Sequence, residues 1–435
     1  MATLQPYQKY YPVVYDYAKQ LPDGWQLLPN IAIFQERIER GHINEELLSV
    51  TIGRGVIKQT DVDIKKDSSN EDKSKYKLIK VGDIAYNKMR MWQGALGYSD
   101  YQGISSPAYV ILKPKMEINP RYFHYMFRIS FYTNYSKRFS YGIVDDQLSL
   151  RYTDFKRMYS IVPPLSVQNS IVAYLDKKNN EIDKFIRNKE RLIELLESEA
   201  ERIISNAINK GVNENAETKY IDDDWLDNIP KHWDYKPLKY FVKMNQFALT
   251  EKTRPDYELQ YIDIGNVTFK GMVNEPEKML FKNAPSRARR IVKSGDTIMS
   301  TVRTYLKAIA FFESADDNLI ASTGFAVLTP TKNVNPKYLK YLLSSSYFIN
   351  KVSFWAIGVN YPGINNDRLK AIKIPVPSTL DEQQEILDFI EIETSKIYSA
   401  ISKAQQEINS IKEYREALIT DLVTGKRSVP QLQMS

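Results

Sequence analysis

Two short segments of the sequence contain residue types that could carry out chemistry. Residues 119–123 (NPRYF) resemble the start of an amino-methylation motif but lack its second proline. Pro255-Asp256 with Glu258 offers the carboxylates of a nuclease site, yet no lysine follows at the usual spacing. The first segment is interpreted as a helix start with proline in the first turn, and the second as a turn. The sequence therefore predicts no catalytic residue.

Metal, thiol and nucleotide chemistry lack the residues that they need. The chain has no cysteine, which excludes disulfides, cysteine metal sites and thiol nucleophiles. Its three histidines, His42, His124 and His232, are far apart and have no ligand spacing. No glycine-rich dinucleotide or phosphate loop and no Walker lysine is present. We therefore expect no metal and no cofactor in this chain.

Composition places broad limits on the class of protein. With 435 residues, 43% of them hydrophobic, the chain is long enough for two cored domains and additional helices. Sixty Lys and Arg against fifty-three Asp and Glu give a net charge of +7, which suits nucleic acid but also many other partners. The N-terminus has no secretion signal, and no apolar run approaches the ~20 residues of a membrane helix. We expect a soluble, cytoplasmic protein with no membrane partner.

One long helical pattern occurs twice, in residues 168–211 and 383–426. Gln383 follows Gln168 by 215 positions, and this offset superimposes two apolar seven-residue repeats without a gap. The repeats form a seam of Leu175, Ile182, Leu196 and Ile203 in the first helix and Ile390, Ile397, Ile411 and Leu418 in the second. Because an amphipathic helix needs a partner, packing of the two helices as a coiled coil is favoured over two helices docked separately on their own domains.

The segment before each long helix is duplicated as well. LPDGW (21–25) matches IPKHW (229–233), VGDIAYNKMR (81–90) matches SGDTIMSTVR (294–303), and NPRYFHYMF (119–127) matches NPKYLKYLL (335–343). These anchors keep their order while the offset drifts only between 208 and 216. The repeat is too long for a solenoid, so it describes one domain-plus-helix module used twice.

The two modules predict an α+β protein with two similar mixed α/β domains joined by an antiparallel, pseudo-twofold coiled coil. Within the first domain we expect a helix over roughly 29–40 and a strand over 47–57. At about 1.5 Å per residue, forty helical residues would hold the domains roughly 60 Å apart at most, which suits a long polymer read at two places. The predicted segments are an arm (1–20), a first domain (21–166), a first helix (167–211), a linker (212–228), a second domain (229–378), a second helix (379–426) and a tail (427–435).

These residues resemble the specificity subunit of type I restriction-modification systems over essentially the whole chain. The resemblance rests on residues 82–114, on Pro-Pro-Leu followed by Gln at 163–168, on Pro-Val-Pro followed by Glu-Gln at 375–383, and on the duplication. In this family two target recognition domains are joined by two helical spacers. The chain departs from the pattern at Val167-Gln168, where the family commonly has Glu-Gln.

The resemblance implies a non-catalytic subunit that binds an asymmetric bipartite sequence in double-stranded DNA. It also implies that the chain recruits two methyltransferase subunits and, for cleavage, the motor-nuclease restriction subunits. S-adenosylmethionine, ATP and magnesium would then belong to those partners. A nucleic-acid-binding scaffold outside restriction-modification is one alternative, but a scaffold would not need two divergent reading domains. A single-chain enzyme is the other alternative.

Base readout in such a protein needs forked donors and amide side chains on presented loops or strands. Candidates in the first domain are Asn87, Lys88, Arg90, Trp92, Gln93, Tyr141 and Gln147, and those in the second are Thr301, Arg303, Tyr305, Asn360, Tyr361 and Asn365. Packing is the alternative role for Trp92 and Tyr141. Arg287, Arg289 and Arg290 are expected to contact phosphates, which position a protein without specifying sequence; an exposed cationic face with no partner is the alternative.

Overall fold

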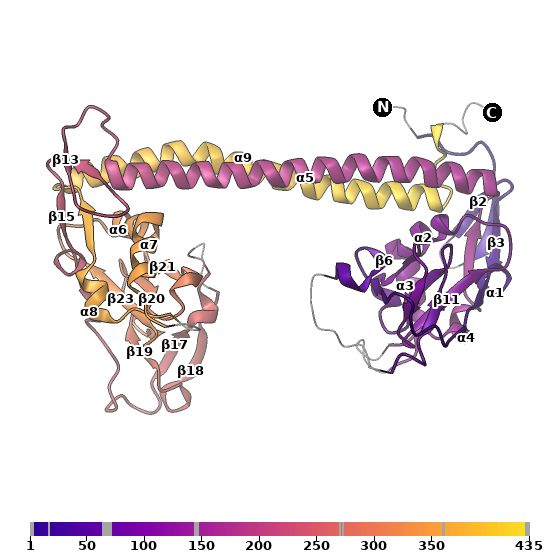
Figure 1. The fold of residues 1–435 in the computed structure, drawn as a ribbon, viewed down its shortest axis with the longest axis horizontal. Helices are drawn as coiled ribbons and strands as arrows, with labels where there is room; N and C mark the ends of the chain where they lie inside the picture. Colours follow the sequence, from indigo (N-terminus) through magenta and orange to yellow (C-terminus); the bar gives the residue numbers. More distant parts are fainter. Residues whose placement is uncertain are drawn as a thin grey trace. The chain divides into compact units, whose positions relative to one another are not determined.

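The computed structural model describes residues 4–15, 18–62, 72–142, 148–268, 271, 274–358 and 362–430, with Tyr305 described by its backbone only. The chain divides into two compact units, Met1–Lys189 with Gln406–Ser435 and Glu190–Gln405. Each unit contains one globular domain and part of each long helix, α5 (Leu165–Lys210) and α9 (Leu380–Val423) (Figure 1).

The first globular domain is built on a four-stranded antiparallel sheet in the order β4-β11-β8-β9. Two-stranded ladders β12-β3, β10-β7, β5-β6 and β1-β2 surround it. Its strands are β1 (Tyr10–Tyr15), β2 (Ala18–Pro22), β3 (Gln26–Pro29), β4 (Phe34–Glu36), β5 (Leu48–Thr51), β6 (Gly55–Lys58), β7 (Lys77–Ile79), β8 (Ile84–Asn87), β9 (Leu96–Tyr98), β10 (Gly103–Ser105), β11 (Tyr109–Pro114) and β12 (Tyr159–Val162). Its helices are α1 (Asn30–Ile33), α2 (Pro120–Arg128), α3 (Ser130–Arg138) and α4 (Tyr152–Phe155), with the 3-10 turns η1 (Gln59–Asp61) and η2 (Met91–Gln93).

The prediction of a helix over residues 29–40 is wrong. Only the single turn α1 is helical, and β4 follows it directly. Phe34 is fully buried, and β4 pairs antiparallel with the end of β11. Sheet pairing and burial of Phe34 therefore override the local helical pattern. The strand expected over 47–57 is instead a hairpin of β5 and β6.

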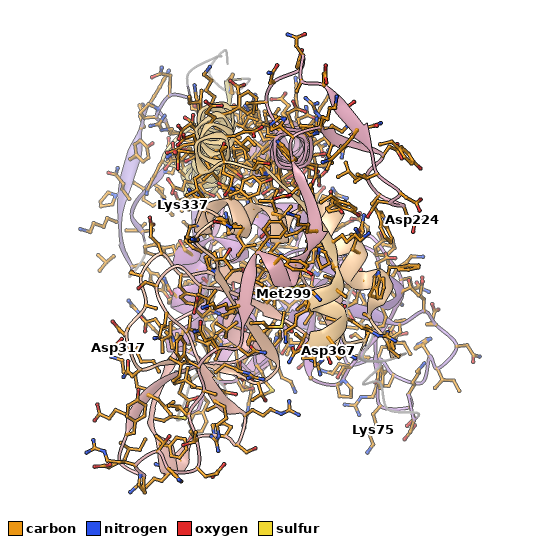
Figure 2. The ribbon with its side chains drawn as sticks, turned by 90° about the vertical axis from the view of Figure 1, so that its left-hand side faces the viewer. Lys75, Asp224, Met299, Asp317, Lys337 and Asp367 are labelled. Carbon is orange, nitrogen blue, oxygen red and sulfur yellow. The ribbon has the colours of Figure 1, made fainter. Side chains whose placement is uncertain are left out.

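The second domain repeats the central sheet as β16-β23-β20-β21 and adds a second sheet in the order β18-β17-β22-β19. Figure 2 shows Met299 of β20 near the middle of this domain, with Asp317 and Asp367 toward its periphery. Its strands are β13 (Thr218–Tyr220), β14 (Asn228–Pro230), β15 (Asp234–Pro237), β16 (Val242–Met244), β17 (Glu258–Ile262), β18 (Glu277–Leu280), β19 (Ala288–Ile291), β20 (Thr297–Ser300), β21 (Ile309–Phe311), β22 (Leu319–Ser322), β23 (Phe325–Pro330) and β24 (Lys373–Val376). Its helices are α6 (Pro336–Ser344), α7 (Ser346–Trp355) and α8 (Asn366–Ala371), with the 3-10 turns η4 (Leu238–Tyr240), η5 (Ile264–Asn266), η6 (Phe281–Asn283) and η7 (Thr304–Leu306).

A duplicated polar joint fixes the start of each long helix to its domain. The side-chain oxygen of Gln168 accepts a hydrogen bond from the backbone N–H of Asn119 at 2.9 Å, and Gln383 accepts from Asn335 at 2.7 Å. Both glutamines are almost fully buried, and both asparagines cap the helix that follows them. A buried amide needs such partners, so the joint explains why a glutamine occurs at the same place in both copies.

The ends of the long helices are held by a second duplicated contact. The hydroxyl of Tyr122 donates to the carbonyl of Val423 at 2.8 Å, and that of Tyr338 donates to the carbonyl of Ile208 at 3.0 Å. The last carbonyls of a helix lack intrahelical partners. Each domain therefore binds the beginning of one long helix and the end of the other, which makes the helix pair part of both domain cores.

Glycine ends each long helix where the chain must turn next to a tryptophan. Gly211 and Gly425 have φ of 77° and 72°, in the left-handed region that favours glycine. A Cβ at Gly211 would lie 3.2 Å from Trp233, and one at Gly425 would lie 2.7 Å from Pro22 and 3.1 Å from Trp25. The helix end expected at Gly211 is confirmed.

The helices α5 and α9 pack together and run antiparallel (Figure 1). In the first unit Asp183 pairs with Arg415, and Lys189 pairs with Glu407 at 2.6 Å, so a later residue of α5 meets an earlier residue of α9. The seam residues Leu175, Ile182, Ile390 and Leu418 are buried, and Leu196, Ile203, Ile397 and Ile411 are half-buried. The expected fold class is confirmed, although the seam also extends into the domain cores: Leu175 and Leu418 belong to the first core and Ile390 to the second.

Among the described residues, no helix is both long and apolar enough to cross a membrane. The same residues contain no group of three or more His, Cys, Asp or Glu side chains placed to bind a metal ion.

His124 on α2 predicts a specific loss of stability in acid. Its Nδ1 accepts a hydrogen bond from the backbone N–H of Tyr98 at 3.2 Å, and burial, followed by the charges of Arg128 and Arg121, lowers its pKa to about 3. Because the unfolded histidine binds its proton near pH 6.5 and the folded one does not, stability falls as the pH drops below that value. We expect a loss of about 2 kcal/mol between pH 6.5 and 5 from this residue.

Thermal unfolding of the wild type and His124→Gln at pH 7.5 and pH 5 measures this contribution. The glutamine variant should lose less of its Tm on acidification. An equal loss in both proteins would show that His124 does not carry the effect. His42→Gln, which changes a half-buried histidine beside Glu39, serves as the control.

Candidate nucleic-acid interface

In the first domain the candidate residues meet where a loop docks on the end of β8. The backbone N–H of Leu150 donates to the carbonyl of Lys88 at 2.8 Å, and Tyr141 and Ser149 exchange two backbone hydrogen bonds at 3.0 and 2.9 Å. The strand end and the loop therefore form one surface. It brings Lys88 and Tyr141, which are far apart in sequence, into the same region.

The second domain has the same docking with different side chains. Ile364 donates to the carbonyl of Thr301 at 2.9 Å, and Ile357 and Gly363 exchange backbone hydrogen bonds at 2.8 and 3.0 Å. A bridge between Val302 and Gly363 adds a further contact. The scaffold of the candidate interface is thus duplicated while its surface residues diverge.

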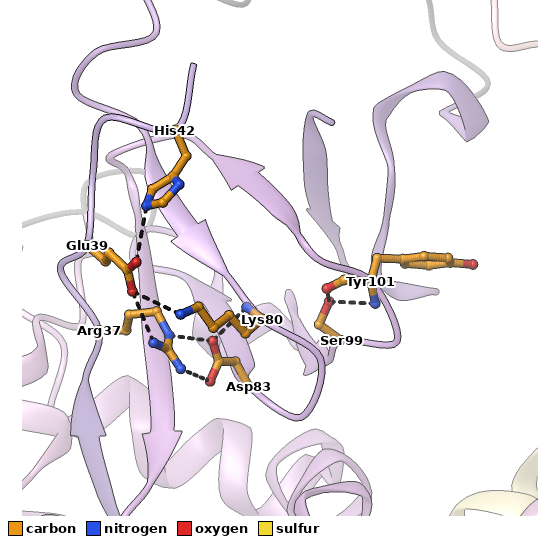
Figure 3. Close-up of polar contacts among 7 residues, drawn as sticks. All are labelled: Arg37, Glu39, His42, Lys80, Asp83, Ser99 and Tyr101. Atoms are coloured by element: carbon orange, nitrogen blue, oxygen red, sulfur yellow. Dashed lines mark hydrogen bonds and ion pairs between the residues drawn. The ribbon is translucent and has the colours of Figure 1, made fainter. Parts of the chain in front are cut away.

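A buried Gly-Asp turn fixes the start of the strand that carries these residues. In the first domain Asp83 accepts from the backbone N–H of Lys80 at 2.8 Å and from the guanidinium of Arg37 at 2.7 and 3.1 Å (Figure 3). The hydrogen bond from Arg37 to Asp83 is the main cause of the raised pKa of the Arg37 guanidinium. In the second domain Asp296 makes the matching bond to Lys293 at 2.8 Å, and burial raises the pKa of its carboxyl. These aspartates position the interface and do not form part of its surface.

The candidate side chains of the first domain have different environments. Arg90 and Gln93 are exposed, and Tyr141 is 79% exposed. Asn87 already accepts from the backbone N–H of Met89 at 2.9 Å. Trp92 is half-buried, and its indole N–H donates to the carbonyl of Met89 at 3.1 Å. The ammonium of Lys137 lies over the Trp92 ring, 4.7 Å from its centroid. Gln147 lies outside the described residues. Arg90, Gln93 and Tyr141 therefore remain the best-presented candidates, while Asn87 and Trp92 support the turn.

In the second domain the candidates Arg303 and Asn365 are exposed, and the side chain of Asn365 already has a structural role. Thr301 donates its hydroxyl to the carbonyl of Gly324 at 2.9 Å, and the side chain of Asn365 caps α8 through the backbone N–H of Arg368 at 2.8 Å. The backbone of Tyr305 lies in η7, and its side chain is not described. Asn360 and Tyr361 lie outside the described residues.

The arginines of the SRARR segment do not form one uniform cationic patch. Arg287 is exposed, and its backbone carbonyl accepts a hydrogen bond from the N–H of Thr323 at 2.8 Å. Thr323 lies in the β22–β23 turn, where the next residue, Gly324, accepts a hydrogen bond from the N–H of Thr301. Arg289 lies 3.2 Å from Glu251 and 5.0 Å from the ring of Phe281. Arg290 is half-buried, with a buried Nε that has no partner among the described residues. Only Arg287 is presented next to the candidate interface.

Sequence reasoning missed the strained turn that presents Arg303. Arg303 and Lys307 have φ of 51° and 50° on either side of η7, and both side chains are exposed. Left-handed backbone is uncommon for residues with a side chain and tends to occur at functional sites. No sequence signal marks it, because neither glycine nor asparagine stands at either position.

The comparisons with known proteins agree with this geometry. The family model described as the type I restriction modification DNA specificity domain matches residues 230–413. The specificity subunits named MjaX and MjaVIII of Methanocaldococcus jannaschii type I restriction enzymes are 25% and 24% identical to this chain, covering 94% and 82% of it and 94% and 84% of their own lengths. The chain is similar to type I restriction-modification specificity subunits over most of its length, and residues 230–413 match their DNA specificity domain.

Solved structures show the same fold for this chain. One of them was solved in work on complex assembly and conformational transition of the type I restriction-modification system. It has a TM-score of 0.69 at 16% identity, and the match covers 93% of this chain and 99% of that chain. The HsdS subunit of Thermoanaerobacter tengcongensis has a TM-score of 0.50 at 16% identity, covering 93% and 98%. The family model matches only the second domain and part of α9, and the internal duplication extends the same architecture to the first.

Proposed function

We propose that this specificity subunit reads an asymmetric bipartite sequence in double-stranded DNA, with one recognition domain for each half-site. The observation that carries the proposal is the duplicated docking of a loop on a strand end. The bonds from Leu150 to Lys88 and from Ile364 to Thr301 repeat the scaffold, whereas the presented residues differ. Equal scaffolds with different donors should read two unlike half-sites.

The helices α5 and α9 would set the spacing between the half-sites. Both are continuous over more than forty residues, and the beginning of one and the end of the other enter each domain core. A rigid element joined to both readers limits the DNA positions that can be bound at the same time. The number of base pairs between half-sites should therefore depend on helix length.

Methylation and cleavage would be carried out by partner subunits in the cytoplasm. We propose that two methyltransferase subunits bind the polar faces of the long helices and the segment Thr424 to Arg427, because a duplicated body offers one patch twice. Restriction subunits would join for cleavage, and S-adenosylmethionine, ATP and magnesium would bind to the partners. The alternative of a scaffold outside restriction-modification has no support in the comparisons.

Methylation-sensitive sequencing of host DNA, with and without this chain, tests the proposed function. One asymmetric bipartite motif should lose its methylation when the chain is absent. The purified chain alone should not transfer labelled methyl groups from S-adenosylmethionine to DNA. Methylation by the chain alone would contradict a non-catalytic role, and a 1:1 complex at saturating methyltransferase would contradict two docking patches.

Replacing Arg303 by Ala should relax specificity in one half-site only. If its guanidinium reads a guanine, the correct base loses about 1–3 kcal/mol of discrimination while the other half-site is unchanged. Binding to duplexes with single substitutions in each half-site measures the effect. Arg90→Ala is the matched control and should affect the other half-site, whereas a uniform loss on all duplexes would assign Arg303 to a phosphate.

A further inference from the structure

A cleft of about 470 Å³ lies in the first domain beside the candidate interface. Its lining includes Glu36 at the end of β4, Lys77 of β7, Lys88 after β8 and Arg151 before α4. Lys88 connects the cleft to the surface described above, because its carbonyl holds the docked loop. The cleft therefore opens next to the residues that would read the first half-site.

The cations that line the cleft outnumber its carboxylate. Lys77 is 6% exposed, and its ammonium lies 2.9 Å from the carboxylate of Glu36 and 2.9 Å from the carbonyl of Tyr109. Glu36 therefore contacts Lys77 and contacts neither Lys88 nor Arg151. Within the part of the chain that the structure describes, neither of these side chains has a hydrogen bond or an ion pair. Burial lowers the pKa of Lys88, and the charge of Lys77 lowers it further.

The scaffold does not require these charges. By the internal duplication, Thr301 stands in the second domain where the first has Lys88, and Asn365 stands where the first has Arg151. Both of these residues are neutral and form structural hydrogen bonds, Thr301 to Gly324 and Asn365 to the helix that it caps. Lys88 is half-buried and Arg151 is exposed. A partly desolvated ammonium without a direct partner opposes folding, so the presence of Lys88 beside a second cation in one domain only points to a ligand.

We propose that this cleft binds a backbone phosphate of DNA beside the first half-site. The inference rests on the proposed function and adds a contact that holds the DNA without reading its sequence. Phosphate oxygens accept charge-assisted hydrogen bonds from ammonium and guanidinium groups, and Lys88 and Arg151 supply both. The second domain has no equivalent pair, so the two half-sites should depend differently on salt.

The experiment compares Lys88→Gln/Arg151→Gln with the wild type in the full-length chain bound to its methyltransferase subunits. Fluorescence anisotropy measures binding to duplexes that carry a single neutral methylphosphonate at successive positions. The wild type should lose affinity at one position flanking the first half-site, and the double variant should not lose any more there. The double variant should bind all sequences roughly tenfold more weakly, with the slope of log affinity against log salt reduced by about 1.

Lys113→Gln is the matched control. Lys113 is an exposed lysine of β11, three positions after Val110, which lines the cleft, so strand alternation directs it to the opposite face of the sheet. It should leave the methylphosphonate profile unchanged. The double variant should keep or raise the Tm, since it removes a partly buried ammonium and an exposed guanidinium that form no ion pair in the described structure.

Several outcomes would overturn the phosphate site. A loss confined to particular base pairs would show base readout by Lys88 or Arg151, and a large fall in Tm would show a structural role. The cleft would be assigned to a free anion if the wild type bound inorganic phosphate tightly and the double variant kept the DNA affinity of the wild type. Failure of the wild-type complex to bind any duplex would instead contradict the proposed function itself.

Discussion

Lengthening both long helices by one turn should lengthen the preferred DNA spacer by about one to two base pairs. Four added helical residues extend each helix by ~6 Å, and DNA rises ~3.4 Å per base pair. The added turn nearly preserves the apolar stripe, so the protein should still fold. Both half-site sequences should be retained, because neither recognition domain is changed.

The ion pairs of the first unit show where the insertions belong. Lys189 pairs with Glu407, and moving seven residues along each antiparallel helix brings Leu196 opposite Ala400. Insertions after Leu196 and after Ala400 therefore add one turn to each helix at the same position along the helix pair, and they keep the ion pairs Lys189–Glu407 and Asp183–Arg415. On the original spacer, binding should fall by roughly 10²–10⁴, because the half-sites can no longer be engaged together.

Binding to duplexes that differ only in spacer length measures the shift. The control inserts the same four residues after Glu214, in the exposed linker that follows α5, and should leave the optimum unchanged. An unchanged optimum in a folded protein with both helices lengthened would mean that α5 and α9 do not set the spacing.

Removing the carboxylate of Asp223 should destabilise the second domain by about 3–5 kcal/mol. The ammonium of Lys351 donates to Asp223, to the hydroxyl of Tyr347 at 2.8 Å and to the carbonyl of Lys373 at 3.1 Å. The side chains of Asp223 and Lys351 are only 5% and 7% exposed. Burial alone would raise the pKa of Asp223, but hydrogen bonds from Lys351 and Tyr235 hold it below the ordinary value. Asp223→Ala would therefore leave a buried ammonium without its counter-ion.

Chemical denaturation of Asp223→Ala, Lys351→Met and the double variant measures the pair. The double variant should recover much of the stability, because an apolar side chain then replaces the unpaired charge. Asp224→Ala changes the exposed neighbouring carboxylate and should stay within about 0.5 kcal/mol of the wild type. A small loss for Asp223→Ala would show that water or another group neutralises Lys351.

The candidate base-reading residues were located partly from the sequence and partly from the structure. The duplication in the sequence identified the segments around Lys88 and Thr301 as equivalent, and the structure brings each of them against a loop about sixty residues later. The same structure assigns Asn365 to a helix cap and Asn87 to a turn. A polar residue type is compatible with reading and with capping, so only its hydrogen-bond partners distinguish these roles.

Two misjudged features show where local sequence reasoning ends. The pattern over 29–40 favours a helix, but Phe34 and its neighbours pair with β11 because that buries Phe34. Nothing in the sequence marks Arg151 as a candidate, because it lines the same cleft as Lys77 and Lys88 only after the strands and loops have assembled. Long-range pairing energies therefore decide such positions.

The sequence by itself determined the duplication, the two long amphipathic helices and the α+β class, because period and order along the chain express helix geometry and repetition directly. Its ordered motifs carried the resemblance to one family. The tertiary structure alone decided the buried joints of Gln168 and Gln383, the left-handed turn at Arg303 and the cleft that brings Lys88 and Arg151 together. Those features depend on contacts between residues distant in sequence and on backbone angles, and neither is encoded in the local pattern.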